Sequence, residues 1–168
     1  MADLIDTLHT LCQVGVAFLG FGGMATAIGS RGTQRHQHAF TNLNGSLLAG
    51  FVLAVGSALP LVFHHFGLES ATALRSAAGV LLATNGAITY YALRWSPTEE
   101  LDPFAKFFFF PAELAINVCL LVVVFGGLAG VAPGIYLVVL VLALFEGGIG
   151  FLIFFHHVFT TENSAQDP

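Results

Sequence analysis

Residues 134–157 read GIYLVVLVLALFEGGIGFLIFFHH, and Glu146 is the one formally charged side chain among them. A helix rises about 1.5 Å per residue and satisfies its backbone hydrogen bonds internally, so roughly 20 apolar residues cross the ~30 Å hydrocarbon layer of a bilayer. These 24 residues meet that length. The stretch is therefore predicted to be a transmembrane helix.

Four further segments approach the same length and apolar character. They are residues 8–28, 47–66, 76–93 and 107–130. The segment 76–93 is the shortest and is rich in small residues, so a chain of four spans, with this segment buried or interfacial, is the alternative. The sequence predicts an all-α integral membrane bundle of about five transmembrane helices, with one domain over residues 1–159 and a polar tail at 160–168.

The composition agrees with lipid as the main solvent of this chain. Of the 168 residues, 56% are hydrophobic and 9% are charged, whereas soluble domains carry about 25% charged residues. The formal net charge is −5 and no basic patch occurs, so nucleic acid is not expected as a partner. Cys12 and Cys119 both lie within apolar runs, which indicates neither a disulfide scaffold nor a Cys-rich zinc site.

Basic residues between the predicted spans indicate the orientation. Arg31 and Arg35 follow the first span, and Arg94 and Lys106 lie between the third and the fourth, whereas the other side of the membrane keeps Arg75. Lys and Arg accumulate in the cytoplasmic loops of membrane proteins. The amino terminus is therefore predicted outside and the carboxyl terminus inside.

Small residues indicate where the predicted helices pack closely, and a proline indicates where one of them bends. Small residues allow close helix approach in lipid. The glycines concerned are Gly20, Gly22 and Gly23 in the first span, Gly50 and Gly56 in the second, and Gly147, Gly148 and Gly150 in the fifth. Pro60, inside the second span, is predicted to kink its helix and to free a backbone carbonyl.

Two acidic residues inside predicted spans are the main candidates for a functional site, because ionisable groups are costly in lipid. Glu113 and Asn117 lie four residues apart and share a face of the fourth span, while Glu146 lies in the fifth. A closed hairpin of these two spans brings Asn117 and Glu146 to the same depth, where they could form a direct hydrogen bond. Asn85, in the third span, lies at a similar depth.

Two interpretations of this polar group remain open. A carboxyl group in lipid is costly to ionise and a second one nearby adds to that cost, so a partly protonated pair could bind or exchange protons or a small cation. In the structural interpretation, one or both acids stay protonated and bond to Asn117 or Asn85, which fixes the helices that meet.

A weaker candidate for a metal site lies at the outer ends of the spans. Its residues are His9, His64, His65 and Glu69. These are acceptable ligands for zinc or copper, but adjacent histidines on a helix point about 100° apart, so at most one of a pair faces inward. The pair at 156–157 falls on the other side of the membrane from the pair at 64–65, which argues against one haem between them. We therefore predict no metal site and no cofactor.

The chain lacks the motifs of hydrolases, zinc proteases and nucleotide-binding enzymes, which argues against these enzyme classes and leaves a membrane redox enzyme as the alternative. The stretch SALPLV at 57–62, followed by GL at 67–68 and ALRSA at 73–77, resembles short uncharacterised bacterial multi-pass membrane proteins, as does PGIYL at 133–137. The resemblance implies a bacterial inner (cytoplasmic) membrane, but no activity and no site residue.

The leading hypothesis is a small oligomeric transport protein, linked to protons or cations, whose buried site contains Glu113, Asn117, Glu146 and Asn85. The first alternative is a non-catalytic accessory or scaffold subunit that packs against a larger membrane complex through its glycine-rich faces. The second is a membrane metal- or haem-binding redox protein that uses the outer histidines. Expected partners are the lipid bilayer and either further copies of the chain or a larger membrane complex.

Overall fold

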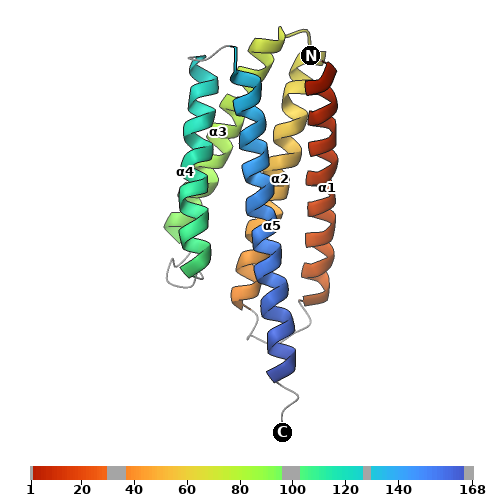
Figure 1. Ribbon diagram of the computed structural model, residues 1–168, viewed down its shortest axis with the longest axis vertical. Helices are drawn as coiled ribbons and strands as arrows, with labels where there is room; N and C mark the ends of the chain where they lie inside the picture. The colour runs from red at the N-terminus through yellow and green to blue at the C-terminus, as the bar shows by residue number, and fades with distance from the viewer. Residues whose placement is uncertain (1, 30–36, 96–102, 127–129, 165–168) are drawn as a thin grey trace.

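The computed structural model of this chain is an all-helical bundle (Figure 1). It describes residues 2–29, 37–95, 103–126 and 130–164. Within these residues the chain forms five helices, which are α1 (Ala2–Gly29), α2 (Gln37–His65), α3 (Ser70–Trp95), α4 (Pro103–Phe125) and α5 (Ala132–Ser164). The predicted all-α class and the predicted number of helices are confirmed.

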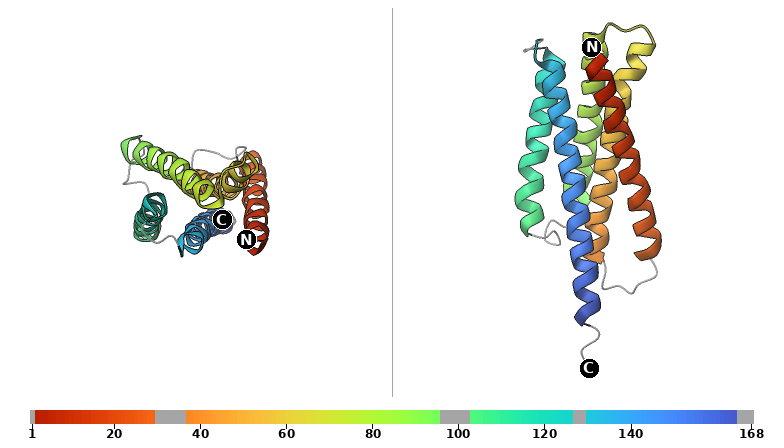
Figure 2. Two further views of the ribbon diagram at one scale, coloured as in Figure 1. Left: turned by 90° about the horizontal axis from the view of Figure 1, so that it is seen from above. Right: turned by 45° about the vertical axis from the view of Figure 1, so that its right-hand side comes forward.

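Successive helices run antiparallel along one common axis (Figures 1 and 2). Helix α2 packs against α1, α3 and α5, and α4 packs against α3 and α5. Helices α2 to α5 thus close a four-membered ring, and α1 lies outside it against α2. Because the number of helices is odd, the start of α1 and the end of α5 lie at opposite ends of the bundle.

Three of the helices are long and apolar enough to cross a membrane. The qualifying segments of the described chain are Asp3–Met24 in α1, Gly45–His65 in α2 and Ala132–His156 in α5. Helix α4 contributes a shorter apolar segment, Phe109–Phe125. Helix α3 carries Ser, Thr and Asn side chains and does not qualify. The three long apolar helices indicate a membrane-associated protein.

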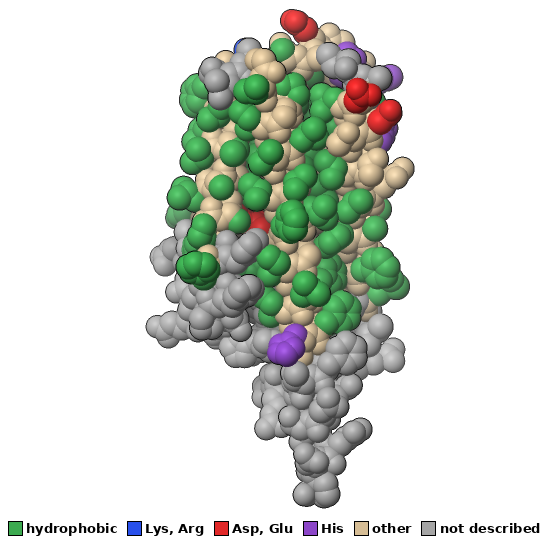
Figure 3. Space-filling model, viewed as in Figure 1, with side chains coloured by type: hydrophobic (Ala, Val, Ile, Leu, Met, Phe, Trp, Pro, Cys, Tyr) green, Lys and Arg blue, Asp and Glu red, His purple; other side chains and the backbone are tan. Residues whose placement is uncertain are grey.

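Large apolar side chains point outward as well as inward. The face seen in Figure 3 is covered by hydrophobic side chains over the height of the described helices, with most acidic side chains near its upper end and histidine side chains near both ends. Phe21, Leu114 and Leu152 are each at least 66% exposed. Water would penalise such a surface, so contiguous exposed apolar area marks contact with lipid or with another protein.

Two helices end at glycines in the left-handed conformation, which side-chain-bearing residues rarely adopt. After α2, Gly67 has a φ of 87°. The amides of Gly67 and Leu68 donate to the carbonyls of His64 and Phe63, at 3.0 and 3.2 Å, as in a Schellman motif. Gly126, with a φ of 68°, follows α4 in the same way. Helix α4 therefore ends at Phe125, five residues before the end predicted from apolar character.

Glycine brings α1 and α2 into the closest approach of the bundle. A Cβ atom at Gly15 would lie 2.6 Å from the backbone nitrogen of Ala54, and one at Gly50 would lie 3.4 Å from the carbonyl oxygen of Gly15. Gly22 faces Leu47 of α2 in the same interface. Packing through small residues is how helices associate in lipid, where the hydrophobic effect between helices is absent.

Pro60 leaves a backbone carbonyl without its helical donor, as predicted, and the structure places a tyrosine on it. A proline at position 60 cannot donate to the carbonyl of residue 56. The hydroxyl of Tyr136, fully buried on α5, donates to the Gly56 carbonyl oxygen at 2.7 Å. A Cβ at Gly56 would lie 2.9 Å from side-chain atoms of Leu140 and Leu81. This bond joins α2 to α5 in the core.

Candidate functional site

The four predicted site residues lie along the α3, α4 and α5 side of the ring. Asn85 is on α3, Glu113 and Asn117 are on α4, and Glu146 is on α5. With a rise of about 1.5 Å per residue, Glu113 and Glu146 lie roughly 18 and 21 Å from the end of the bundle where α4 meets α5. Both acids are thus at mid-height, and Figure 3 shows an acidic side chain among the hydrophobic ones at this level.

Glu113 receives hydrogen bonds from two helices. Its Oε2 atom accepts from the Asn85 side-chain amide at 2.6 Å and from the Thr89 hydroxyl at 3.4 Å, both on α3. The Asn117 amide, one turn along α4, lies 3.5 Å from the same oxygen. A carboxylate surrounded by N–H and O–H donors is well stabilised at low dielectric. The Asn85 bond also ties α3 to α4.

Asn117 does not bridge the two acids. Its side-chain amide donates at 2.8 Å to the backbone carbonyl of Glu113, in addition to the longer contact with the carboxylate. A short polar side chain inside a helix readily bonds to the carbonyl one turn earlier, which requires no second helix to be ordered. Asn117 therefore bonds within α4, and the structure shows no bond from it to Glu146.

Glu146 is the most deeply buried acid among the described residues, with 6% of its surface exposed. Its Oε1 atom is fully buried and has no hydrogen-bond partner. Glu113 lies on α4, the helix that packs against α5. A buried polar atom without a partner is rare in folded proteins and calls for a ligand, a proton or a water molecule.

Thr89, which was not predicted from the sequence, completes the donor set of Glu113. Thr89 lies one helical turn after Asn85, so the two residues share a face of α3. That spacing is the signal that could have found it. A threonine in an apolar helix is common, however, and its position opposite an acid becomes visible only once α3 and α4 are placed side by side.

The outer histidines and Glu69 do not assemble into a site. His9, His64, His65 and Glu69 are all exposed. The Nδ1 atom of His64 lies 3.3 Å from the carbonyl oxygen of Leu68, within the end of its own helix. Over the described part of the chain, no three His, Cys, Asp or Glu side chains come close enough to hold a metal ion.

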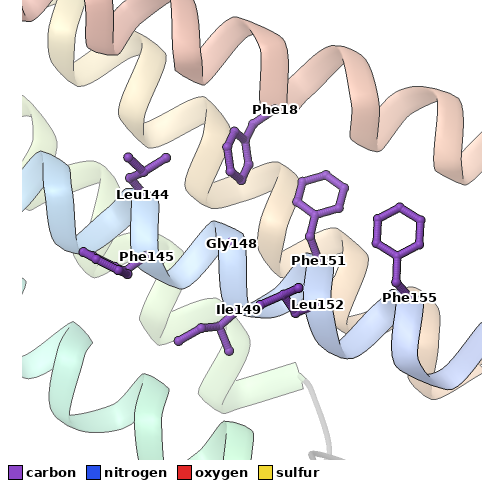
Figure 4. A pocket seen from close by; sticks show the side chains of 8 residues that line it. All are labelled: Phe18, Leu144, Phe145, Gly148, Ile149, Phe151, Leu152 and Phe155. Atoms are coloured by element: carbon purple, nitrogen blue, oxygen red, sulfur yellow. The ribbon is translucent and has the colours of Figure 1, made fainter.

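An apolar groove of about 440 Å³ opens between α1 and α5 (Figure 4). Phe18 projects into it from α1, and the other lining residues, all on α5, are Leu144, Phe145, Gly148, Ile149, Phe151, Leu152 and Phe155. Glu146 lies on the same helix but does not line the groove. The groove therefore offers no polar chemistry and is separate from the acid pair.

No protein-family model, curated protein or solved structure matches this chain. The resemblance to short bacterial membrane proteins thus stays a prediction.

Proposed function

We propose that this chain is a small integral membrane protein of a bacterial inner membrane, and that it moves protons or small cations through an oligomer. In this proposal all five helices cross the bilayer, with the amino terminus outside and the carboxyl terminus inside. The length of α3 favours the fifth crossing, since its 26 residues extend about 39 Å, enough for the ~30 Å hydrocarbon layer. Arg31 and Arg35 lie outside the described residues, so the orientation rests on the sequence.

The observation that carries the proposal is the buried Glu146 carboxyl group beside Glu113. Intramembrane acids are expensive, face a partner or a water-filled cavity, and mark ion pathways or proton relays. Glu113 is provided with donors by Asn85 and Thr89, which accounts for it structurally. Glu146 has no such partner at Oε1. A purely structural role would leave this oxygen unexplained, whereas binding of an exchangeable cation or proton explains it.

The ring formed by α2 to α5 is narrow, and large apolar side chains fill its interior. Five of these side chains are almost completely buried, namely Leu53, Leu81, Leu120, Val139 and Leu140. One copy therefore offers little room for a continuous polar pathway. An oligomer in which copies meet near the acid pair supplies a second wall, which is why self-association belongs to the proposal.

Flux measurements in liposomes test the proposal. Purified protein reconstituted into liposomes is expected to dissipate an imposed proton or alkali-cation gradient faster than empty liposomes. Glu146→Gln keeps the size of the side chain but removes its exchangeable acid, so the flux should fall to the rate of empty liposomes. A fluorescent pH indicator inside the liposomes, together with cation-sensitive dyes, reports the flux.

Glu69→Gln is the matched control, because it makes the same chemical change at an exposed acid between α2 and α3. It should leave the flux unchanged. Equal flux from wild type and Glu146→Gln, at equal protein density in the liposomes, would show that this carboxyl group is not part of the pathway.

A second function is favoured by glycines that face no neighbour. A Cβ atom added at Gly20 or Gly23 of α1, at Gly79 or Gly86 of α3, or at Gly148 of α5 would meet nothing within 4 Å. Small residues on the outside of a bundle allow another helix to approach closely. These positions support an accessory or scaffold subunit that packs against a larger membrane complex.

Purification in mild detergent separates this second function from the first. A subunit of a complex is expected to co-purify with a partner at fixed stoichiometry, and Gly79→Leu with Gly86→Leu should release that partner because the added side chains block close approach. The same pair of changes is not expected to alter the content of helix. Isolation of the wild-type chain alone would argue against the accessory role.

A further inference from the structure

We infer that the two buried acids have different roles, with Glu146 carrying an exchangeable proton and Glu113 remaining a carboxylate, so that the species handled at this site is a proton rather than a metal cation. This inference rests on the proposed function and specifies its substrate. It stands on the unequal hydrogen bonding of the two carboxyl groups across the interface of α4 and α5.

The surroundings of Glu113 suit a negative charge. Asn85 and Thr89 from α3 and Asn117 from α4 all direct donors at Oε2, the first of them at 2.6 Å. Hydrogen bonds from N–H and O–H groups to an ionised carboxylate are stronger than those between neutral groups. If Glu113 were protonated, one of its carboxyl oxygens would become an O–H donor, and the carboxyl group would accept hydrogen bonds less well.

The surroundings of Glu146 suit a neutral acid. This side chain is 94% buried, and its Oε1 atom has no donor. An ionised carboxylate in this position would leave its Oε1 atom without water or a hydrogen-bond donor, which is a costly arrangement in a protein. A proton on Glu146 removes that charge, and it also removes the repulsion between two carboxylates on neighbouring helices.

The following ionisable residues, whose side chains the structure describes, lie away from Glu146 along the helices. On α1, Asp3, Asp6 and His9 are in the first three turns, and on α2, His64 and His65 are the last two residues. Arg75 is near the start of α3, against Gly126 at the end of α4. Cys119 of α4 and Tyr136 of α5 lie closer to the end where these helices meet, and Tyr136 is committed to the Gly56 carbonyl. Glu113 is therefore the charged group that governs Glu146.

The donor set argues against a metal ion. Hard cations such as Ca²⁺ and Mg²⁺ need about six oxygen ligands. Here the amides of Asn85 and Asn117 present N–H groups to Glu113. The carbonyl freed by Pro60 is occupied by the Tyr136 hydroxyl. A proton needs only one carboxyl oxygen, and that requirement is met at Glu146.

The step is a simple proton transfer. One O–H bond breaks at Glu146, its electron pair stays on that carboxyl group, and one O–H bond forms on a water molecule, so the charge of the pair changes from −1 to −2. Uptake of a proton by Glu146 from water at the other face restores the charge of −1 and completes a cycle, while Glu113 stays a carboxylate throughout. No oxidant, reductant or metal takes part.

Infrared spectroscopy of the purified protein at neutral pH tests the assignment without requiring transport. Wild type should show the C=O band of a protonated carboxyl group, shifted to lower frequency in D₂O. The band should be lost in Glu146→Gln and retained in Glu113→Gln and in the control Glu69→Gln. If Glu146→Gln does not fold, Glu146→Asp replaces it, and the C=O band should then appear at a shifted frequency. Loss of the band in Glu113→Gln but not in Glu146→Gln, or no band in wild type, overturns the inference.

The transported species is tested in liposomes with choline as the only other cation. Proton flux should persist without Na⁺ and K⁺, and it should be lost in Glu146→Gln. Flux that requires Na⁺ or K⁺ would overturn the inference while leaving a transport function in place. Absence of any flux in wild type would instead overturn the proposed function, and the infrared band would still decide whether Glu146 holds the proton.

Discussion

Replacing Gly15 with leucine is expected to lower the free energy of unfolding by about 3 kcal/mol, the upper end of the usual penalty for overpacking. Even a Cβ atom at this position would lie 2.6 Å from the backbone nitrogen and 2.9 Å from the Cα atom of Ala54. Backbone atoms cannot rotate away as a side chain does, so α1 has to move off α2. Denaturant titration of the purified protein in mild detergent, followed by circular dichroism, measures the loss.

Gly20→Leu is the matched control, because it introduces the same side chain on the same helix. Gly20 is exposed, and nothing lies within 4 Å of a Cβ atom added there. Its stability should remain close to that of wild type. If the two variants unfold at the same denaturant concentration, the close approach of α1 and α2 is not a feature of the folded protein.

The helices themselves were predictable because length and apolar character act locally. Residues 134–157 fall wholly within α5, and the predicted segment 8–28 falls within α1. In lipid, a long apolar segment satisfies its backbone hydrogen bonds by forming a helix, so its secondary structure depends little on the helices that pack beside it. The end of α4 was harder to predict, since Gly126 turns the chain while apolar residues continue.

Helix α3 shows where apolar character alone is insufficient. The predicted segment 76–93 was the weakest of the five, yet the helix runs over Ser70–Trp95 and is longer than α4. Its buried face carries Ala77 and Ala78, which are small rather than strongly apolar, together with Asn85. Helix-to-helix packing and the bond to Glu113 hold α3 in place, and neither contributes to a hydropathy average.

The depth of the acid pair was predictable from the sequence, but the hydrogen-bond partners were not. Counting residues from the turn between α4 and α5 places Asn117 and Glu146 at one level. Which way each side chain points depends on how the helices rotate about their axes, and sequence separation does not fix that rotation. Asn117 accordingly bonds within α4, and Glu146 is left without a partner at Oε1.

The same limit applies to the carbonyl that Pro60 frees. Its existence follows from the chemistry of proline, whereas its partner, Tyr136, is distant in the chain and is set by the packing of α2 on α5. This pair permits a quantitative test, because the need for the tyrosine hydroxyl depends on the missing N–H of the proline.

Tyr136→Phe is expected to lower the free energy of unfolding by about 1 to 3 kcal/mol, the penalty for leaving a buried acceptor without a donor. The ring stays in place, so the loss reports the hydroxyl bond to Gly56 alone. In a Pro60→Ala background, the new amide at position 60 can donate to the same carbonyl and complete the helical ladder.

The penalty of Tyr136→Phe should therefore be smaller with alanine than with proline at position 60, and the difference is the coupling energy of a double-mutant cycle. Denaturant titrations of wild type, both single variants and the double variant in one detergent supply the four free energies. Equal penalties in the two backgrounds would mean that the tyrosine stabilises the bundle only by packing. A smaller penalty with alanine would show that α5 supplies the donor that proline removes from α2, so that the proline and the helix contact depend on each other.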